Sequence, residues 1–124
     1  SASQPSSTPR DEDLPVLDAA GVMREMGDAD GEIYREIADV FLVDLPVAVA
    51  RLCDAGDAAS MLIPALHEVA NSLGAVGARR AEARVRNLER RLVDGEPIAP
   101  ADAVRETEAA LQAVEAALRA WLAA

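Results

Sequence analysis

The sequence predicts an all-α protein, an antiparallel four-helix bundle with a short extra N-terminal helix. Its 124 residues suit one compact domain. Apolar residues make up 51% of the chain, and most of them are Ala, Leu or Val, of which Ala and Leu favour helices. They recur at spacings of three and four between breaks that contain Gly or Pro, which is typical of amphipathic helices. Such helices bury their apolar stripes against one another in a bundle.

The N-terminal segment differs in composition from the rest. Residues 1–15 are rich in Ser and Pro and then acidic, with little apolar surface to bury, so we interpret them as a flexible linker. Residues 16–124 form the domain. Within it, Asp18 is expected to cap a short helix, Ala19–Met26, which ends at Gly27. A linker of this kind is typical of a domain that follows another module.

Four longer helices are expected after the first turn. In the first of them the helix continues through Pro46, because packing offsets the lost hydrogen bond. Asp57 or Ser60 is expected to cap the second. The first of the four is predicted over residues 32–55. The second is predicted from its cap, within residues 57–60, to an end between residues 73 and 76. The third and fourth are predicted over residues 79–93 and 100–122.

The first long helix carries apolar residues at helical spacing, and these form the predicted inward stripe: Ile33, Ile37, Val40, Phe41, Leu45, Ala48 and Leu52. Cys53 is also expected in the core, because a free Cys behaves as a small apolar residue. The acidic residues just before this helix, Asp28 and Asp30, lack the later ligands of a calcium loop. We interpret them as a solvated helix cap.

The charge and the Cys and His content exclude several function classes. A net charge of −10 argues against nucleic acid and against a direct contact with a membrane surface. One cysteine and one histidine provide neither an internal disulfide nor a usual zinc site, so no metal is expected. The N-terminus lacks a secretory pattern, and we expect a cytoplasmic protein. The arginine-rich helix over 79–93 is interpreted as a solvated face paired with Glu82 and Glu89.

His67 is the only histidine of the chain and falls within the second long helix. On a helical wheel it points away from the Leu and Val stripe, so its ring is expected to face solvent. No local partner suits nucleophile–base or metal catalysis, and no phosphate-binding loop for ATP is present. An imidazole acting alone fits phosphoryl transfer, because a neutral ring nitrogen is a competent nucleophile near pH 7. The residues expected around the ring are Ile63, Pro64, Ala70, Asn71 and Gly74.

This stretch resembles the histidine-phosphotransfer (HPt) domains of two-component phosphorelays. The motif of that family runs H-x-L-K-G-S-[SA]-x-x-x-G-[AL] and is followed by a helix that contains Leu-Glu. Here His67 falls on the phosphorylated histidine, and the other matches are Val69, Ser72, the pair Gly77 and Ala78, and the pair Leu88 and Glu89. The segment with Pro46 also resembles the second helix of the family.

The resemblance implies a signalling intermediate. His67 would accept a phosphoryl group from an aspartate of a response-regulator receiver domain and pass it to another receiver. The domain would need no cofactor of its own, with magnesium on the partner receiver, and no independent catalytic or ATP-binding machinery. A histidine kinase is a further expected partner. We expect a monomer or a part of a larger multidomain kinase.

Two positions depart from the family motif. Ala70 stands where the family has lysine, and Asn71 stands where it has glycine. Arg79 and Arg80 are candidates for the missing charge support, and Asn71 has an amide that can bond a phosphoryl oxygen. The departures motivate a second hypothesis, a degenerate HPt-like docking module that binds a receiver or kinase without carrying phosphate. A third is a helical dimerisation module built on the last helix.

Overall fold

The structure is a computed structural model that describes residues 10–124, and every regular element in this range is helical. This confirms the all-α prediction. A short 3-10 helix precedes five α-helices, and all five α-helices have the predicted bounds within a residue or two. The elements are η1 (Asp11–Asp13), α1 (Ala19–Met26), α2 (Glu32–Ala55), α3 (Ala59–Ala75), α4 (Arg79–Val93) and α5 (Pro100–Ala123).

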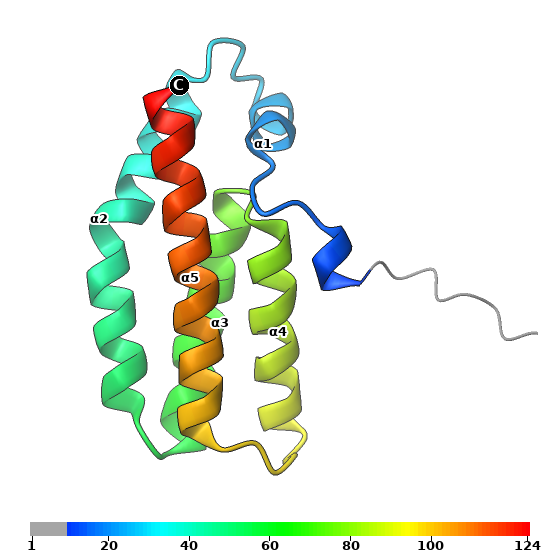
Figure 1. Cartoon of the computed structure of the whole chain (residues 1–124), viewed down its shortest axis with the longest axis vertical. Coiled ribbons are helices and arrows are strands. Elements are labelled where there is room, and N and C mark those ends of the chain that lie inside the picture. Colours follow the sequence, from blue (N-terminus) through cyan, green and yellow to red (C-terminus); the bar gives the residue numbers. More distant parts are fainter. Residues whose placement is uncertain (1–9) are drawn as a thin grey trace, which may run out of the picture.

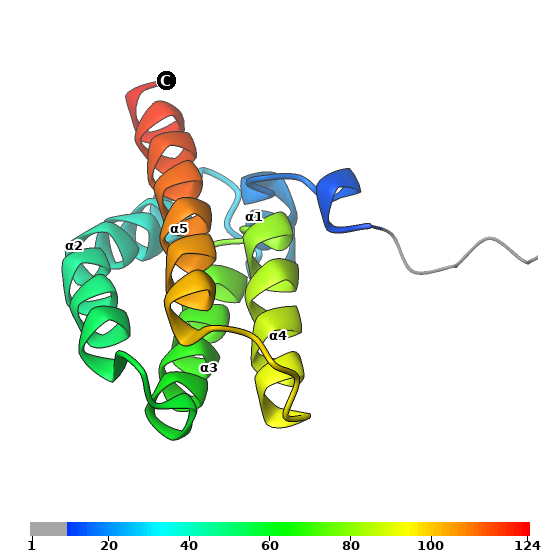
Figure 2. The same cartoon turned by 60° about the horizontal axis from the view of Figure 1, so that its bottom comes forward.

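Helix α3 lies at the centre of the packing, where it contacts α2, α4 and α5. The links from α2 to α3 and from α4 to α5 lie at one end of the molecule, and the link from α3 to α4 lies at the other (Figure 1). Helix α1 and η1 lie to one side, next to α4, as the turned view also shows (Figure 2). None of the helices within residues 10–124 is both long and apolar enough to cross a membrane.

Tyr34 joins three helices at one end of the core. Its side chain is fully buried, and its hydroxyl donates a hydrogen bond of 2.5 Å to the carbonyl of Val76, at the end of α3. Its ring meets Trp121 of α5 edge-on, with ring centroids 4.8 Å apart, a favoured aromatic arrangement. Since a buried hydroxyl needs a partner, this bond fixes where α2 lies relative to the end of α3.

Asp28 caps α2 from inside the protein. Its carboxylate accepts hydrogen bonds from the backbone N–H groups of Tyr34, at 2.8 Å, and Ile33, at 3.3 Å. The side chain is buried, so the prediction of a solvated cap is wrong for Asp28. Asp30 behaves as expected, because it is exposed and accepts from the N–H of Glu32. A carboxylate at a helix N-terminus satisfies free N–H groups and complements the helix dipole.

Most of the predicted stripe of α2 faces inward, because Phe41, Leu45 and Leu52 are buried and Ile37 and Ala48 are partly buried. Two of its members do not. Ile33 and Val40 are exposed, whereas the positions that reach the core are Tyr34, Ala38, Phe41, Leu45, Leu52 and Ala55. Cys53 is exposed as well, so its expected place in the core is wrong, and its thiol donates to Glu108 of α5. The physical reason is the Tyr34 hydroxyl, whose bond to α3 sets the rotation of α2. The helix continues through Pro46, as expected.

The N-cap of α3 is also not the one expected. Neither Asp57 nor Ser60 caps the helix. The N-cap residue is Ala58, which makes no side-chain cap bond. Its carbonyl accepts from the backbone of Met61 and Leu62 instead, so local backbone bonds close the first turn.

Residues 10–15 dock on α4. Arg80 donates to the carbonyls of Leu14 and Glu12, each at 3.0 Å, and Arg84 donates to the carboxylate of Asp11 at 3.0 Å. Polar contacts therefore hold a segment that has little apolar surface. The prediction of a flexible linker over residues 1–15 is wrong for residues 10–15, and residues 1–9 lie outside the described part of the chain.

The turn between α3 and α4 depends on Gly77, which adopts a left-handed conformation with φ of 76°. A Cβ atom there would lie 2.8 Å from the carbonyl oxygen of Asp18 and from a methyl group of Val22. The Gly77 carbonyl also accepts from the N–H of Asp18 at 2.8 Å. Only glycine fits both the backbone angle and the close approach of α1.

We expect Gly77→Ala to destabilise the protein by about 3 kcal/mol or more, because left-handed strain adds to a clash with α1. The matched control is Gly95→Ala, since Gly95 has the same φ of 76° with nothing within 4 Å of the added Cβ. The control should lose only about 1–2 kcal/mol, the cost of the strain alone. Urea unfolding measures both values. If both variants lost the same free energy of unfolding, the close approach of α1 to Gly77 would add nothing to the cost of the substitution.

Alkaline unfolding should depend on Tyr34. Burial, with a smaller contribution from the carboxylate of Asp18, raises the pKa of Tyr34 from 10.0 to about 12. The unfolded chain therefore releases this proton first, so the contribution of Tyr34 to the free energy of unfolding stays level below pH 10 and falls between pH 10 and about 12, by at most about 1.4 kcal/mol per pH unit. The chain contains no lysine that would titrate in the same range.

The control for this prediction is Tyr34→Phe. At neutral pH it should lose about 1–3 kcal/mol, because the Val76 carbonyl is left without its donor. It should also lack the Tyr34-dependent fall at high pH, so the two stability curves converge. The exposed Cys53 titrates equally in both proteins. Parallel curves in urea unfolding across this pH range would contradict the assignment.

Candidate functional site

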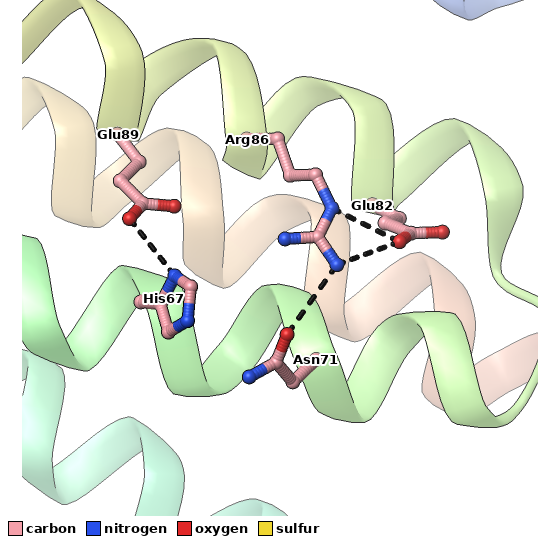
Figure 3. Close-up of polar contacts among 5 residues, drawn as sticks. All are labelled: His67, Asn71, Glu82, Arg86 and Glu89. Atoms are coloured by element: carbon pink, nitrogen blue, oxygen red, sulfur yellow. Dashed lines mark hydrogen bonds and ion pairs between the residues drawn. The ribbon is translucent and has the colours of Figure 1, made fainter.

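His67 stands on the outer side of α3. Its side chain is 56% exposed, while Leu62, Leu66, Val69 and Leu73 of the same helix are buried. The exposure predicted from the helical wheel is therefore confirmed. The ring lies beside α4, whose polar side chains come close to it (Figure 3). The backbone of a central, well-packed helix holds the imidazole in place.

Glu89 of α4 holds one nitrogen of the ring. The Nδ1 atom of His67 and the Oε2 atom of Glu89 are 3.0 Å apart (Figure 3). Because a carboxylate only accepts hydrogen bonds, the proton of this bond belongs to Nδ1. In the neutral ring the lone pair then lies on Nε2. The Glu89 side chain is only 20% exposed, so it is held more firmly than a free surface carboxylate.

A second polar cluster lies one turn further along α3. Arg86 of α4 contacts the carboxylate of Glu82 at 2.9 Å, and its Nη2 donates to the side-chain oxygen of Asn71 at 3.4 Å. Asn71 follows His67 by four residues, and such residues share one face of a helix. Figure 3 shows the two clusters side by side along the α3–α4 contact. The sequence had paired Glu89 with arginines, whereas the structure pairs it with the histidine.

The other residues expected around the ring divide into two groups. Pro64 and Asn71 are exposed, and Ile63 and Gly74 are half-buried, so these four contribute to the surface. Ala70 is fully buried within the core, so its expected place on the surface around the ring is wrong. The reason is that its position on α3 turns into the packed interior of the bundle. A Cβ at Gly74 would lie 2.9 Å from a carboxylate oxygen of Glu82, so this glycine leaves room for that side chain.

The arginines expected to support charge at His67 lie elsewhere. Arg79 pairs with Asp18 and Glu25, both at 3.8 Å, and Arg80 bonds the carbonyls of Leu14 and Glu12. Arg79 therefore contacts α1 and its cap, and Arg80 holds the segment before α1, so the expectation for both is wrong. Among the arginines of α4, Arg86 reaches α3 beside His67, through Asn71.

The sequence contained a signal for the residues that were missed. Glu82, Arg86 and Glu89 recur at spacings of four and three, which places them on one face of α4. That face borders the inward stripe of the helix, where side chains can reach a neighbouring helix. The spacing alone does not identify which neighbour they meet.

An apolar groove of about 570 Å³ runs between α2 and α3. Its apolar walls include Ile37, Phe41, Ala48 and Val69, and charged residues line its rim. One rim pair, Arg51 and Glu68, joins the two helices at 3.1 Å. Exposed valines of α2 extend the apolar surface beside it, namely Val40, Val43 and Val47. Together they give this side of the protein a surface suited to a partner.

The chain matches no family model, no curated protein and no solved structure. Within residues 10–124, no group of three or more His, Cys, Asp or Glu side chains is placed to hold a metal ion. The chemistry open to the site therefore has to be argued from His67 and its neighbours.

The hydrogen bond from His67 to Glu89 predicts the tautomer of the ring. In mildly alkaline buffer, nitrogen–proton correlation NMR should show the proton on Nδ1 and an unprotonated Nε2. Glu89→Ala should lose this preference, because the only acceptor at Nδ1 is removed. The matched control is Glu68→Ala, since Glu68 is next to His67 in sequence but pairs with Arg51. An unchanged spectrum for Glu89→Ala would contradict the bond.

Proposed function

We propose that this protein is a phosphorelay intermediate that carries a phosphoryl group on His67. The observation that supports this best is the held imidazole, which is exposed on a rigid helix and bonded to Glu89 through Nδ1. Such a ring offers the lone pair of Nε2 to an incoming electrophile. The resemblance to histidine-phosphotransfer domains, in the spacing from His67 to Gly77, adds to the argument.

In the proposed reaction, the Nε2 lone pair attacks the phosphorus of an aspartyl phosphate on a receiver domain. An N–P bond forms while the P–O bond to the aspartyl carboxyl breaks, and its electron pair stays on the carboxylate oxygen. The ring is left as a phosphoimidazolium, whose positive charge the Glu89 carboxylate stabilises through Nδ1–H. The reverse steps return the phosphoryl group to an aspartate of a second receiver.

The proposal divides the machinery between two proteins. The receiver brings the aspartate and the magnesium ion, and this domain brings the nucleophile and a docking surface. In this view α2 to α5 are the four helices of an antiparallel bundle, with η1 and α1 added at the side (Figure 1). The groove between α2 and α3, with the exposed valines, favours a receiver that covers both helices and meets His67 at their edge. The domain acts in the cytoplasm, alone or within a larger kinase.

The direct test is phosphoryl transfer to the protein. Receiver domains encoded in the same genome are loaded with radiolabelled phosphoryl groups from acetyl phosphate and mixed with the wild type. We expect one of them to transfer label to His67 as an acid-labile, alkali-stable phosphate. His67→Gln should take up none, because the amide has no nucleophilic ring nitrogen.

The control for folding is a thermal melt, in which His67→Gln should match the wild type because the side chain is exposed. Equal labelling of the two proteins would rule out the proposed role of His67. If a receiver binds the wild type and His67→Ala equally while no label is ever transferred, the domain is instead a docking module without phosphate chemistry.

A further inference from the structure

Asn71 lies where its side chain could stabilise the negative charge of a phosphoryl group on His67. The buried Ala70 carries no charge, Arg79 is paired with carboxylates at α1, and Arg80 bonds backbone carbonyls before α1. Asn71 lies one turn from His67 on the same exposed side of α3. Its amide carries both an acceptor and two donors, so its effect on an anion depends on which end faces that anion.

The orientation of this amide follows from Arg86. A guanidinium group has only donors, so the group that faces it has to be the oxygen of Asn71. The structure has this arrangement, with Nη2 of Arg86 at 3.4 Å from Oδ1. The opposite orientation would direct N–H groups at N–H groups. The amide nitrogen therefore turns away from Arg86, and Figure 3 shows it on the side of His67, with the second ring nitrogen facing it.

Arg86 is itself held in place. Its Nε and Nη2 atoms lie 3.0 Å and 2.9 Å from the same carboxylate oxygen, Oε2, of Glu82 on the preceding turn of α4, so this ion pair restrains the guanidinium. The Glu82 side chain is partly buried above Gly74, where no side chain competes for the space. Because Glu82 neutralises much of its charge, Arg86 acts on the site mainly through the group that it orients.

We propose that the series Glu82, Arg86 and Asn71 presents the Asn71 amide N–H₂ to the phosphoryl group on Nε2 of His67. In this role Asn71 donates to a phosphoryl oxygen, and Arg86 is a positioning residue. The inference rests on the proposed function. In this arrangement residues of two helices, α3 and α4, together stabilise the phosphoryl group. In the motif of the HPt family, a lysine at the position of Ala70 would provide that charge from α3 alone. The amide has its direction before the phosphoryl group arrives, so little reorganisation is needed during transfer.

The test uses phosphoramidate, a small phosphoryl donor, so that no receiver is needed. The rate of label uptake and the lifetime of phosphohistidine are measured for the wild type and for Asn71→Ala, Arg86→Gln and the double variant. We expect Asn71→Ala to slow uptake about tenfold, the factor for losing one hydrogen bond to a charged oxygen. Arg86→Gln should slow it less, because a freed amide still samples the productive orientation.

The decisive comparison is the double variant. If Arg86 acts through Asn71, Arg86→Gln should have no further effect once Asn71 is alanine. An additive loss would mean that Arg86 acts on the phosphoryl group directly, and it would overturn the proposal. The matched control is Arg119→Gln, because Arg119 forms the same i,i+4 pair with Glu115 on α5. This control should label at the wild-type rate.

The outcomes also separate this inference from the proposed function. A wild type that takes up label at His67, with Asn71 and Arg86 variants that label at equal rates, would overturn the inference and leave the phosphoacceptor role standing. A wild type that takes up no label from phosphoramidate or from any receiver would overturn both. Thermal melts of all variants check folding, and small shifts are expected because Asn71 and Arg86 are not buried.

Discussion

The contact between α3 and α4 is the constraint on which the candidate site depends. His67 and Asn71 lie on α3, whereas Glu82, Arg86 and Glu89 lie on α4. The contacts of His67 with Glu89 and of Asn71 with Arg86 cross the interface between the two helices. The third contact, between Glu82 and Arg86, lies within α4 and orients Arg86. The turn at Gly77 keeps the two helices close, and the bond from Tyr34 to Val76 anchors the end of α3 beside it. A shift of α4 along α3 by one turn would separate every partner, because one helical turn is about 5.4 Å.

The electrostatic setting gives these contacts their significance. The whole chain carries a net charge of −10, and the phosphoryl group of the proposed reaction would add negative charge to it. Such a group needs local donors, since the average field of the protein repels it. Glu89 meets the imidazole from the side opposite the free nitrogen, and Arg86 faces the oxygen of Asn71. The carboxylates thus lie at the far ends of both series of contacts. In the proposed reaction the near ends, the Nε2 lone pair of His67 and the amide N–H₂ of Asn71, would meet the phosphoryl group.

The two sides of α3 differ in character, and under the proposed function one would serve chemistry and the other docking. The side toward α4 carries the polar partners of His67, and the side toward α2 carries the apolar groove and the exposed valines. A partner that covers both sides would gain affinity from apolar burial on one and meet the histidine on the other. The rotation of α2 produces this surface, because it places Tyr34 in the core and leaves Val40 and Val43 outside.

The sequence by itself determined the helices and the exposure of His67. Helix ends depend on local features, such as the cap at Asp18 and the glycine at Gly27, and the wheel position of a residue depends only on its own helix. The tertiary structure decided the partners of His67, the burial of Ala70, and the exposure of Ile33 and Cys53. Six arginines of α4 were equivalent in the sequence, and only the rotation of that helix against α3 selected Arg86. Helix rotation depends on packing between residues far apart in the chain, and a local pattern does not contain that information.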